Sequence, residues 1–123
     1  MIFHETHEKV MDGSKTQTRR PVKPNDVEIY NRDGGLDAIK RNGRTIWKVG
    51  GTYAVQPGRT AKGIGRILIT KIRVERLYKI SNADARAEGF SGRDEFARVW
   101  KKLYPKKGSF FDHVAVLEFE LVK

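Results

Sequence analysis

The amino-acid sequence predicts an α+β domain in which two helices flank a small, mostly antiparallel sheet that can close into a barrel. Residues 64–77 and 114–122 alternate apolar and polar side chains with the two-residue period of strands. Between these segments, apolar residues recur with the spacing of amphipathic helices over 81–104. A chain that runs from a short helix through strands to two helices and a final strand is typical of the α+β class. The 123 residues are enough for one domain, spanning 1–123, and for a real hydrophobic core.

The first fifty residues carry weaker signals. A short helix is expected over 3–12, because its apolar residues have helical spacing and Gly13 fits a C-terminal stop. From Lys15 to Arg20 the sequence predicts a turn that leads into a strand, with Pro21 closing it. Residues 24–51 are rich in Gly, Asn and Asp turn signals, so this stretch is compatible with either a hairpin or a mobile loop.

The strands of the second half have clearer faces. Residues 52–56 predict a strand that Pro57 and Gly58 stop. In 64–77, one predicted face carries Leu68, Thr70, Ile72 and Val74, and the opposite face carries Lys71, Arg73 and Glu75. In 114–122, alternation points four side chains inward: Ala115, Leu117, Phe119 and Leu121.

Two helices are predicted between these strands. Ser81 is expected to cap the first, with Asp84 as part of a capping box and Gly89 at its end. Ser91 is expected to cap the second, which Pro105 ends. The apolar face of the second helix has i, i+3, i+4, i+7 spacing and comprises Phe96, Val99, Trp100 and Leu103. We therefore expect a core that includes Phe96, Trp100, Leu117, Phe119, Ile72 and Val74.

The charge balance points to a class of partner. Lys and Arg number 25 against 15 Asp and Glu, which gives a net charge of +10 and a pI near 10.0. Such an excess predicts a polyanionic partner, most often nucleic acid, although a generically basic protein would have the same balance. Aromatic residues lie among the basic clusters, a combination suited to single-stranded nucleic acid. Single-stranded RNA is therefore an expected partner.

Other function classes are excluded or disfavoured. Without cysteine the chain cannot form disulfides, a thiolate zinc site or a cysteine nucleophile. His4 and His7 have a metal-compatible spacing, but His113 is remote, so we predict no metal and no cofactor. No apolar run approaches the ~20 residues needed to cross a bilayer, and the first residues lack a signal-peptide pattern. We expect a cytoplasmic monomer with no membrane partner.

Residues 13–20, Gly-Ser-Lys-Thr-Gln-Thr-Arg-Arg, form the first unusual segment. Three cations and three hydroxyls follow the glycine within seven residues. Cations at this density repel one another unless an anion or a carboxylate lies among them. The pattern is compatible with an anion-binding segment, but composition alone favours a solvated edge strand protected by its charges.

Glu88 is the second unusual feature. It is expected in the last turn of its helix, where the macrodipole is negative and disfavours a carboxylate by about 0.3–1 kcal/mol. Residues that break a local rule are often functional. The alternative is that Glu88 is a solvated, good helix former.

These segments carry a resemblance to a known family. Residues 13–20 resemble the opening motif of the ASCH family, a PUA-like β-barrel group. The segment 77–90, then Phe96 and Trp100, and a closing strand that ends in Leu-Glu-Phe-Glu (117–120) resemble the rest of it. The likeness extends over nearly the whole chain and is greatest to short, stand-alone bacterial and phage members.

The resemblance implies a cleft formed by the opening motif and the glutamate of the helical segment. Members of the family are associated with RNA binding, and some with hydrolysis. The small N4-acetylcytidine amidohydrolases have a Lys, a Thr and a Glu at the positions of Lys15, Thr18 and Glu88. By this likeness Thr18 is the nucleophile, Lys15 the base and Glu88 the acid or base.

Four further residues are expected to bind the ligand. Arg19 and Arg20 would hold an oxyanion or phosphate. Tyr53 and Trp47 are our candidates for aromatic stacking near the cleft. Two functions remain open: an RNA-binding or nucleotide-binding domain that can also hydrolyse single-stranded RNA, and an amidohydrolase that deacylates a modified nucleoside such as N4-acetylcytidine.

Overall fold

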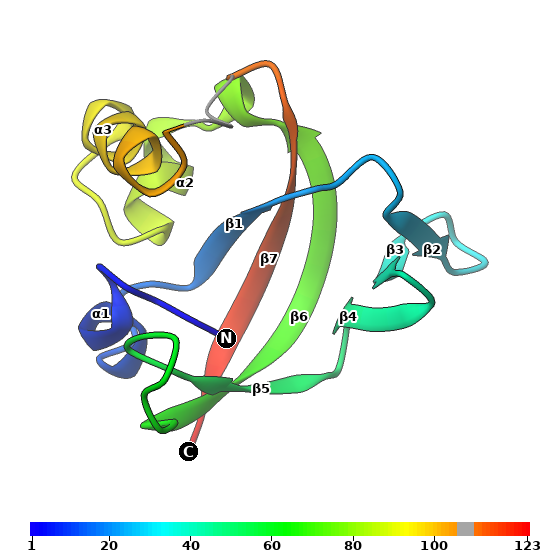
Figure 1. Cartoon of the computed structure of the whole chain (residues 1–123), viewed down its shortest axis with the longest axis horizontal. Helices are drawn as coiled ribbons and strands as arrows, with labels where there is room; N and C mark the ends of the chain where they lie inside the picture. Colours follow the sequence, from blue (N-terminus) through cyan, green and yellow to red (C-terminus); the bar gives the residue numbers. More distant parts are fainter. Residues whose placement is uncertain (106–109) are drawn as a thin grey trace.

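The computed structural model describes residues 1–105 and 110–123. In these residues an antiparallel sheet is accompanied by three α-helices (Figure 1). The strands are β1 (Gln17–Pro21), β2 (Val27–Tyr30), β3 (Leu36–Arg41), β4 (Arg44–Lys48), β5 (Thr52–Val55), β6 (Gly65–Arg76) and β7 (His113–Val122). The helices are α1 (His7–Met11), α2 (Asn82–Ala87) and α3 (Arg93–Leu103), and a short 3-10 turn covers Leu77–Lys79. The α+β class predicted from the sequence is confirmed.

The sheet is built around the long β6–β7 pair. Its order is β1-β7-β6-β3-β2, with β4 paired to β3 and β5 paired to β6, and the paired strands are antiparallel. The sheet curves strongly, so that the helices lie on one side of the molecule and β2–β4 project on the other (Figure 1). In the described residues the end strands β1 and β2 do not pair, so the sheet has the form of an open barrel.

The faces of β6 differ from those predicted. Ile67 and Ile69 are fully buried, whereas Thr70 is exposed and Leu68 is half-buried. The register shifts between Ile69 and Lys71, after which Ile72 takes the buried face. The expectation that Leu68 and Thr70 share a face with Ile72 was wrong, because this bulge inserts one residue and reverses the alternation.

The closing strand β7 is buried on both faces. Ala115, Leu117 and Phe119 point into the barrel as predicted, and Leu121 is half-buried. Val114 and Val116, on the opposite face, are at most 1% exposed because α2 and α3 cover them. Burial on two faces explains the near-continuous apolar sequence of this strand.

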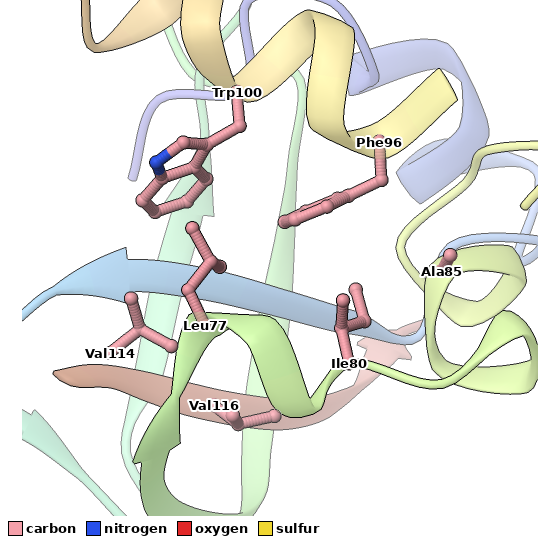
Figure 2. Packing of buried hydrophobic residues seen from close by; sticks show 7 residues of the cluster. All are labelled: Leu77, Ile80, Ala85, Phe96, Trp100, Val114 and Val116. Atoms are coloured by element: carbon pink, nitrogen blue, oxygen red, sulfur yellow. The ribbon is translucent and has the colours of Figure 1, made fainter. Parts of the chain in front are cut away.

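The helical core packs on that second face of β7. Phe96 and Trp100 of α3 are 3% and 5% exposed, and their ring centroids are 5.7 Å apart. They cover a cluster whose other members are Leu77, Ile80, Ala85, Val114 and Val116 (Figure 2). Val74 is half-buried, and Leu103, which was expected in the core, is 42% exposed.

Two predicted helix starts have different outcomes. The Ser81 hydroxyl accepts a hydrogen bond from the Asp84 N–H at 3.0 Å, so the predicted cap of α2 is confirmed. Ser91 does not cap α3, because Gly92 occupies the N-cap position. Instead the Ser91 N–H donates to Glu95 Oε1 at 3.0 Å.

The N-terminal third is also more precisely defined than the sequence indicated. The first helix covers His7–Met11 and not 3–12, because Phe3 is extended and its N–H donates to the Gln56 carbonyl at 2.8 Å. The segment 24–51 contains β2, β3 and β4. Asn42 and Gly43 both have positive φ in the β3–β4 turn, as expected for a tight hairpin.

Candidate functional site

The opening motif runs between α1, the end of α2 and β7. The Lys15 N–H donates to the Lys9 carbonyl at 3.0 Å, and the Thr16 N–H donates to the Ala87 carbonyl at 2.8 Å. Lys15 therefore lies in the turn before β1 begins, and β1 then pairs with β7 from Gln17 onward. These backbone bonds hold the start of β1 against the C-terminal end of α2.

The same contacts bring Lys15 to Glu88, which is distant in sequence. The Lys15 ammonium donates to the Glu88 carbonyl oxygen at 2.6 Å and to Glu88 Oε1 at 3.2 Å. Both residues are only 3% exposed. Gly89 follows with φ +99°, which turns the chain sharply after the helix. The side chain of Glu88, the C-cap residue of α2, is thus held inside the protein next to Lys15.

The surroundings of Lys15 disfavour its charged form. Burial lowers the pKa of the Lys15 ammonium below its usual value, and the positive charges of Arg20 and Lys9 lower it further. The charge and hydrogen bond of Glu88 oppose this shift without cancelling it. The ring centroids of Phe3 and Phe90 lie 5.8 and 5.7 Å from the Lys15 nitrogen. These rings exclude water from Lys15, and their faces attract its charged form.

Arg19 lies beneath this pair in a network of carboxylates. Its side chain is fully buried, with Nη2 2.5 Å from Glu75 Oε1 and 3.4 Å from Asp84 Oδ2. Its Nη1 lies 3.7 Å from Glu88 Oε2 and donates to Gln17 Oε1. The Arg19 guanidinium, which the sequence analysis expected to bind the ligand, is therefore paired with protein groups. Its contact with Glu88 Oε2 helps to orient the Glu88 carboxylate.

Arg20 and Thr18 are placed differently. The Arg20 guanidinium lies 5.0 Å from the Phe3 ring centroid and donates to the Ile2 carbonyl at 2.7 Å. Burial lowers the pKa of Arg20, although an arginine remains charged at neutral pH. Thr18 is 4% exposed. Both residues line the same pocket as Lys15 and Glu88.

The pocket has a volume of about 400 Å³. Its polar side is formed by Lys15, Thr18, Arg19, Arg20 and Glu88. Its apolar wall comes from the N-terminal segment and α3, and includes Phe3, Phe90, Phe96, Val99, Trp100 and Tyr104. The predicted convergence of the four residues Lys15, Thr18, Arg20 and Glu88 is therefore what the structure contains.

Two sequence candidates lie elsewhere. Tyr53 packs among the barrel residues, and Trp47 lies on β4 with the Arg41 guanidinium 5.6 Å from its ring. Neither lines the pocket. Two residues that sequence reasoning did not select do line it. Trp100 was expected in the core and was also one of the aromatic residues among the basic clusters, and Arg59 was the first cation of the cluster 59–76.

Three polar atoms around the pocket are buried without a hydrogen-bond partner among the described residues. They are Arg19 Nε, Glu88 Oε2 and Trp100 Nε1, and each belongs to a residue that lines the pocket. Buried polar groups in proteins are nearly always paired, so these atoms are open to a hydrogen bond with water or with a ligand in the pocket. In the same described residues, no three His, Asp or Glu side chains gather as a metal site would require.

The helices that the structure describes are all too short or too polar to span a bilayer. The fold and the pocket together define an α+β domain with an open antiparallel barrel and a buried Lys–Glu pair at one side. A solved structure of a protein from Enterococcus faecalis V583, assigned to family model DUF984, is similar with a TM-score of 0.63 at 22% identity. The match covers 97% of this chain and 71% of that one.

A second similar structure is the ASCH domain from Lactobacillus crispatus JV V101. It has a TM-score of 0.56 at 17% identity, over 94% of this chain and 69% of that one. No family model and no curated protein matches the sequence. The chain therefore has the fold of the ASCH domain, and the fold that the sequence motifs implied is confirmed.

Proposed function

We propose that the chain binds a nucleoside unit, free or within single-stranded RNA, in the Lys15–Glu88 pocket and hydrolyses an acyl-amide bond on its base. The main observation in support of this proposal is a buried Lys15–Glu88 pair in a pocket of about 400 Å³ that Thr18 also lines. Arg20 and Arg59 add positive charge beside the Lys15–Glu88 pair, whereas Arg19 is already paired with Glu75 and Asp84. This charge favours a nucleoside that carries phosphate. The aromatic wall of the pocket suits the flat face of a base.

In this proposal one part of the pocket holds the base and another part holds a phosphate. Arg59 is exposed at the pocket and makes no hydrogen bond or ion pair with the described residues. Its guanidinium is therefore available for a phosphate of a nucleotide or of RNA. Phe90 and Tyr104 supply ring faces next to the buried polar groups.

The lowered pKa of Lys15 is the observation that favours catalysis over binding alone. The lowered pKa raises the fraction of Lys15 that is neutral, and this amine accepts the proton of the Thr18 hydroxyl while the Thr18 oxygen bonds to the acyl carbon. The proton passes to Glu88 Oε1, 3.2 Å from the amine, and from there to the departing amine as the C–N bond breaks. Water then hydrolyses the acyl-threonine ester, which releases the acid and restores Thr18.

The same groups could act on a ribose 2′-hydroxyl and cleave RNA, so the test includes both substrates. The protein is incubated with N4-acetylcytidine and with a labelled single-stranded RNA oligomer, and both mixtures are analysed by chromatography. We expect release of cytidine and acetate, with losses of roughly 10²- to 10⁴-fold in the rate for Lys15→Met and Glu88→Gln.

The outcomes separate the functions. RNA fragments that depend on Lys15 and Glu88 would make the protein a ribonuclease. Products from neither substrate, with RNA binding that weakens with salt, would leave a binding domain only. In that case Glu88→Ala should leave RNA affinity unchanged or slightly raised, because a negative charge leaves the pocket. If the protein neither binds RNA nor releases products from either substrate, the proposal is refuted.

A further inference from the structure

A larger hollow of about 1180 Å³ lies on the other side of Trp100 from the pocket. It is a groove between β2 and the loop that follows β1 on one side and the upper parts of β6 and β7 on the other. In Figure 1 this is the region where β2 and β3 project beside the ends of the long strands. None of the residues assigned to the acyl-amide reaction lines it.

Cations with few protein partners line this groove. Lys23 and Lys71 are exposed, and their ammonium groups make no hydrogen bond or ion pair with the described residues. Arg76 is also exposed and uses Nη1 for the Phe111 carbonyl at 2.6 Å. Asp26 is neutralised by Arg41, which approaches it at 2.7 and 2.8 Å.

Two carboxylates, Glu28 and Asp112, remain in the groove and weaken its positive charge. The exposed cations Lys23, Lys71 and Arg76 nevertheless leave groups in the groove that can contact phosphates.

Exposed aromatic rings accompany these cations. Tyr30 is 57% exposed and Phe111 is 70% exposed, and both line the groove. Phe111 lies next to Tyr78, which is 42% exposed, with ring centroids 5.6 Å apart. Rings interleaved with cations are the features that single-stranded nucleic acid uses, because bases stack on the rings while phosphates contact the cations.

Trp100 lies in the wall of both the groove and the pocket. It lines both hollows, is 5% exposed, and its Nε1–H has no partner in the described part of the chain. Figure 2 shows this nitrogen on the side of the ring that faces away from Phe96. A ligand that extends from one hollow to the other would pass this buried donor, which is the type of unpaired group that a ligand acceptor satisfies.

We propose that this groove binds the nucleotides of a single-stranded RNA that flank the nucleoside held in the pocket. The inference rests on the proposed function, because it makes RNA, rather than a free nucleoside, the substrate of the same site. It also gives the net charge of +10 a role that a pocket for one nucleoside does not require. Lys71 and Arg76 contact phosphates, and Phe111 stacks on a base.

The test measures affinity by fluorescence anisotropy with a labelled single-stranded RNA oligomer at several salt concentrations. For Lys71→Ala/Arg76→Ala we expect roughly tenfold weaker binding, and a log–log salt slope reduced by about 1.4, which corresponds to two phosphate contacts. The matched control Lys48→Ala/Lys62→Ala removes the same charge from exposed positions outside both hollows and should change affinity much less.

Two single substitutions refine the result. Phe111→Ala should weaken binding roughly tenfold with little change in salt slope, because a stacking contact is lost. Glu28→Gln should tighten binding, because a negative charge leaves the groove. Equal losses in the groove and control variants, or no loss in either, would overturn the proposal. A groove substitution that instead converts a dimer to a monomer in sedimentation would assign the groove to a second copy of the chain, and would also overturn it.

Turnover of free N4-acetylcytidine distinguishes this inference from the proposed function. The groove variants should hydrolyse the free nucleoside at the wild-type rate, because neither residue lines the pocket. If no protein hydrolyses it, yet the groove variants alone lose RNA affinity, the proposed reaction fails and the groove stands. If hydrolysis occurs and the groove variants bind RNA normally, the groove assignment fails and the reaction stands.

Discussion

The Lys15 ammonium group is buried away from water, and its charged partners determine the free-energy cost of this burial. Its main counter-charge is Glu88, whereas Glu88 also has Arg19 Nη1 at 3.7 Å from its second carboxylate oxygen. A buried charge that loses its partner destabilises a protein strongly, because desolvation is no longer offset. The two members of the pair are therefore not equivalent.

This asymmetry predicts unequal effects on stability. Glu88→Ala should lower the free energy of unfolding by about 3–5 kcal/mol, because it leaves Lys15 buried without its counter-charge. Lys15→Met should cost clearly less, since Arg19 still compensates Glu88 and the methionine fills the space between Phe3 and Phe90. Urea denaturation at neutral pH measures both, and equal losses would contradict this account of the network.

The lowered pKa of Lys15 also predicts a pH dependence. In the unfolded chain the pKa of a lysine is about 10.4, so at pH values between the lowered folded pKa and 10.4 the unfolded state binds more protons. Stability contributed by Lys15 should therefore rise with pH over that interval. We expect wild type to gain stability relative to Lys15→Met as the pH rises from the lowered folded-state pKa towards about 10.4. A constant difference over this range would show that burial does not shift the titration of Lys15.

At the scale of elements, α2 is the support that positions Glu88. It is a short helix of six residues whose start depends on the Ser81 cap and whose end is Glu88 itself. Ser81→Ala should lower the free energy of unfolding by about 1 kcal/mol, because the Asp84 N–H loses its acceptor. Ser91→Ala is the matched control and should change stability only slightly, since the Ser91 side chain caps no helix. Equal losses measured by thermal denaturation would contradict the difference between the two serines.

The elements also show what a sequence can and cannot specify. The run of apolar and β-branched residues in 114–122 and the helical spacing around Phe96 and Trp100 predicted β7 and α3 correctly, because both segments carry the apolar residues that their burial requires. The bulge after Ile69 was missed, because the predicted faces assumed strict alternation over the whole of 64–77. The strands β2 and β4 have only four and five residues and lie among strong turn signals, so the sequence left 24–51 open between a hairpin and a loop.

The candidate site was partly predictable for the same reasons. The density of cations in 13–20 and the unfavourable place of Glu88 marked both residues of the pair, and the family resemblance joined them. Arg59 and Trp100 gave no such signal, because a surface arginine and a tryptophan at a core position are both ordinary. Tyr53 and Trp47 were misplaced, since the curvature of the sheet could not be known before the strands of 24–51 were assigned.

At the scale of the whole molecule, Trp100 lines two hollows, and only one of them contains the buried Lys15–Glu88 pair. Thr18 and Arg20 come from β1 and Glu88 from the end of α2, and all three line a pocket that α3 also borders. Figure 1 shows α2 and α3 on the same side of β1. The ASCH fold thus assembles the pocket from both halves of the chain. The proposed reaction in this pocket depends on the Thr18 hydroxyl as the attacking group.

The most direct measurement of that claim compares two threonines of the same segment. Thr18→Val and Thr16→Val each replace a hydroxyl by a methyl group, but Thr18 is buried in the pocket whereas the Thr16 side chain is exposed. The initial rate of cytidine release from N4-acetylcytidine should fall by at least about 10³-fold in Thr18→Val, because the nucleophile is lost, and should stay within about twofold of wild type in Thr16→Val. Turnover by Thr18→Val at the wild-type rate would contradict the account.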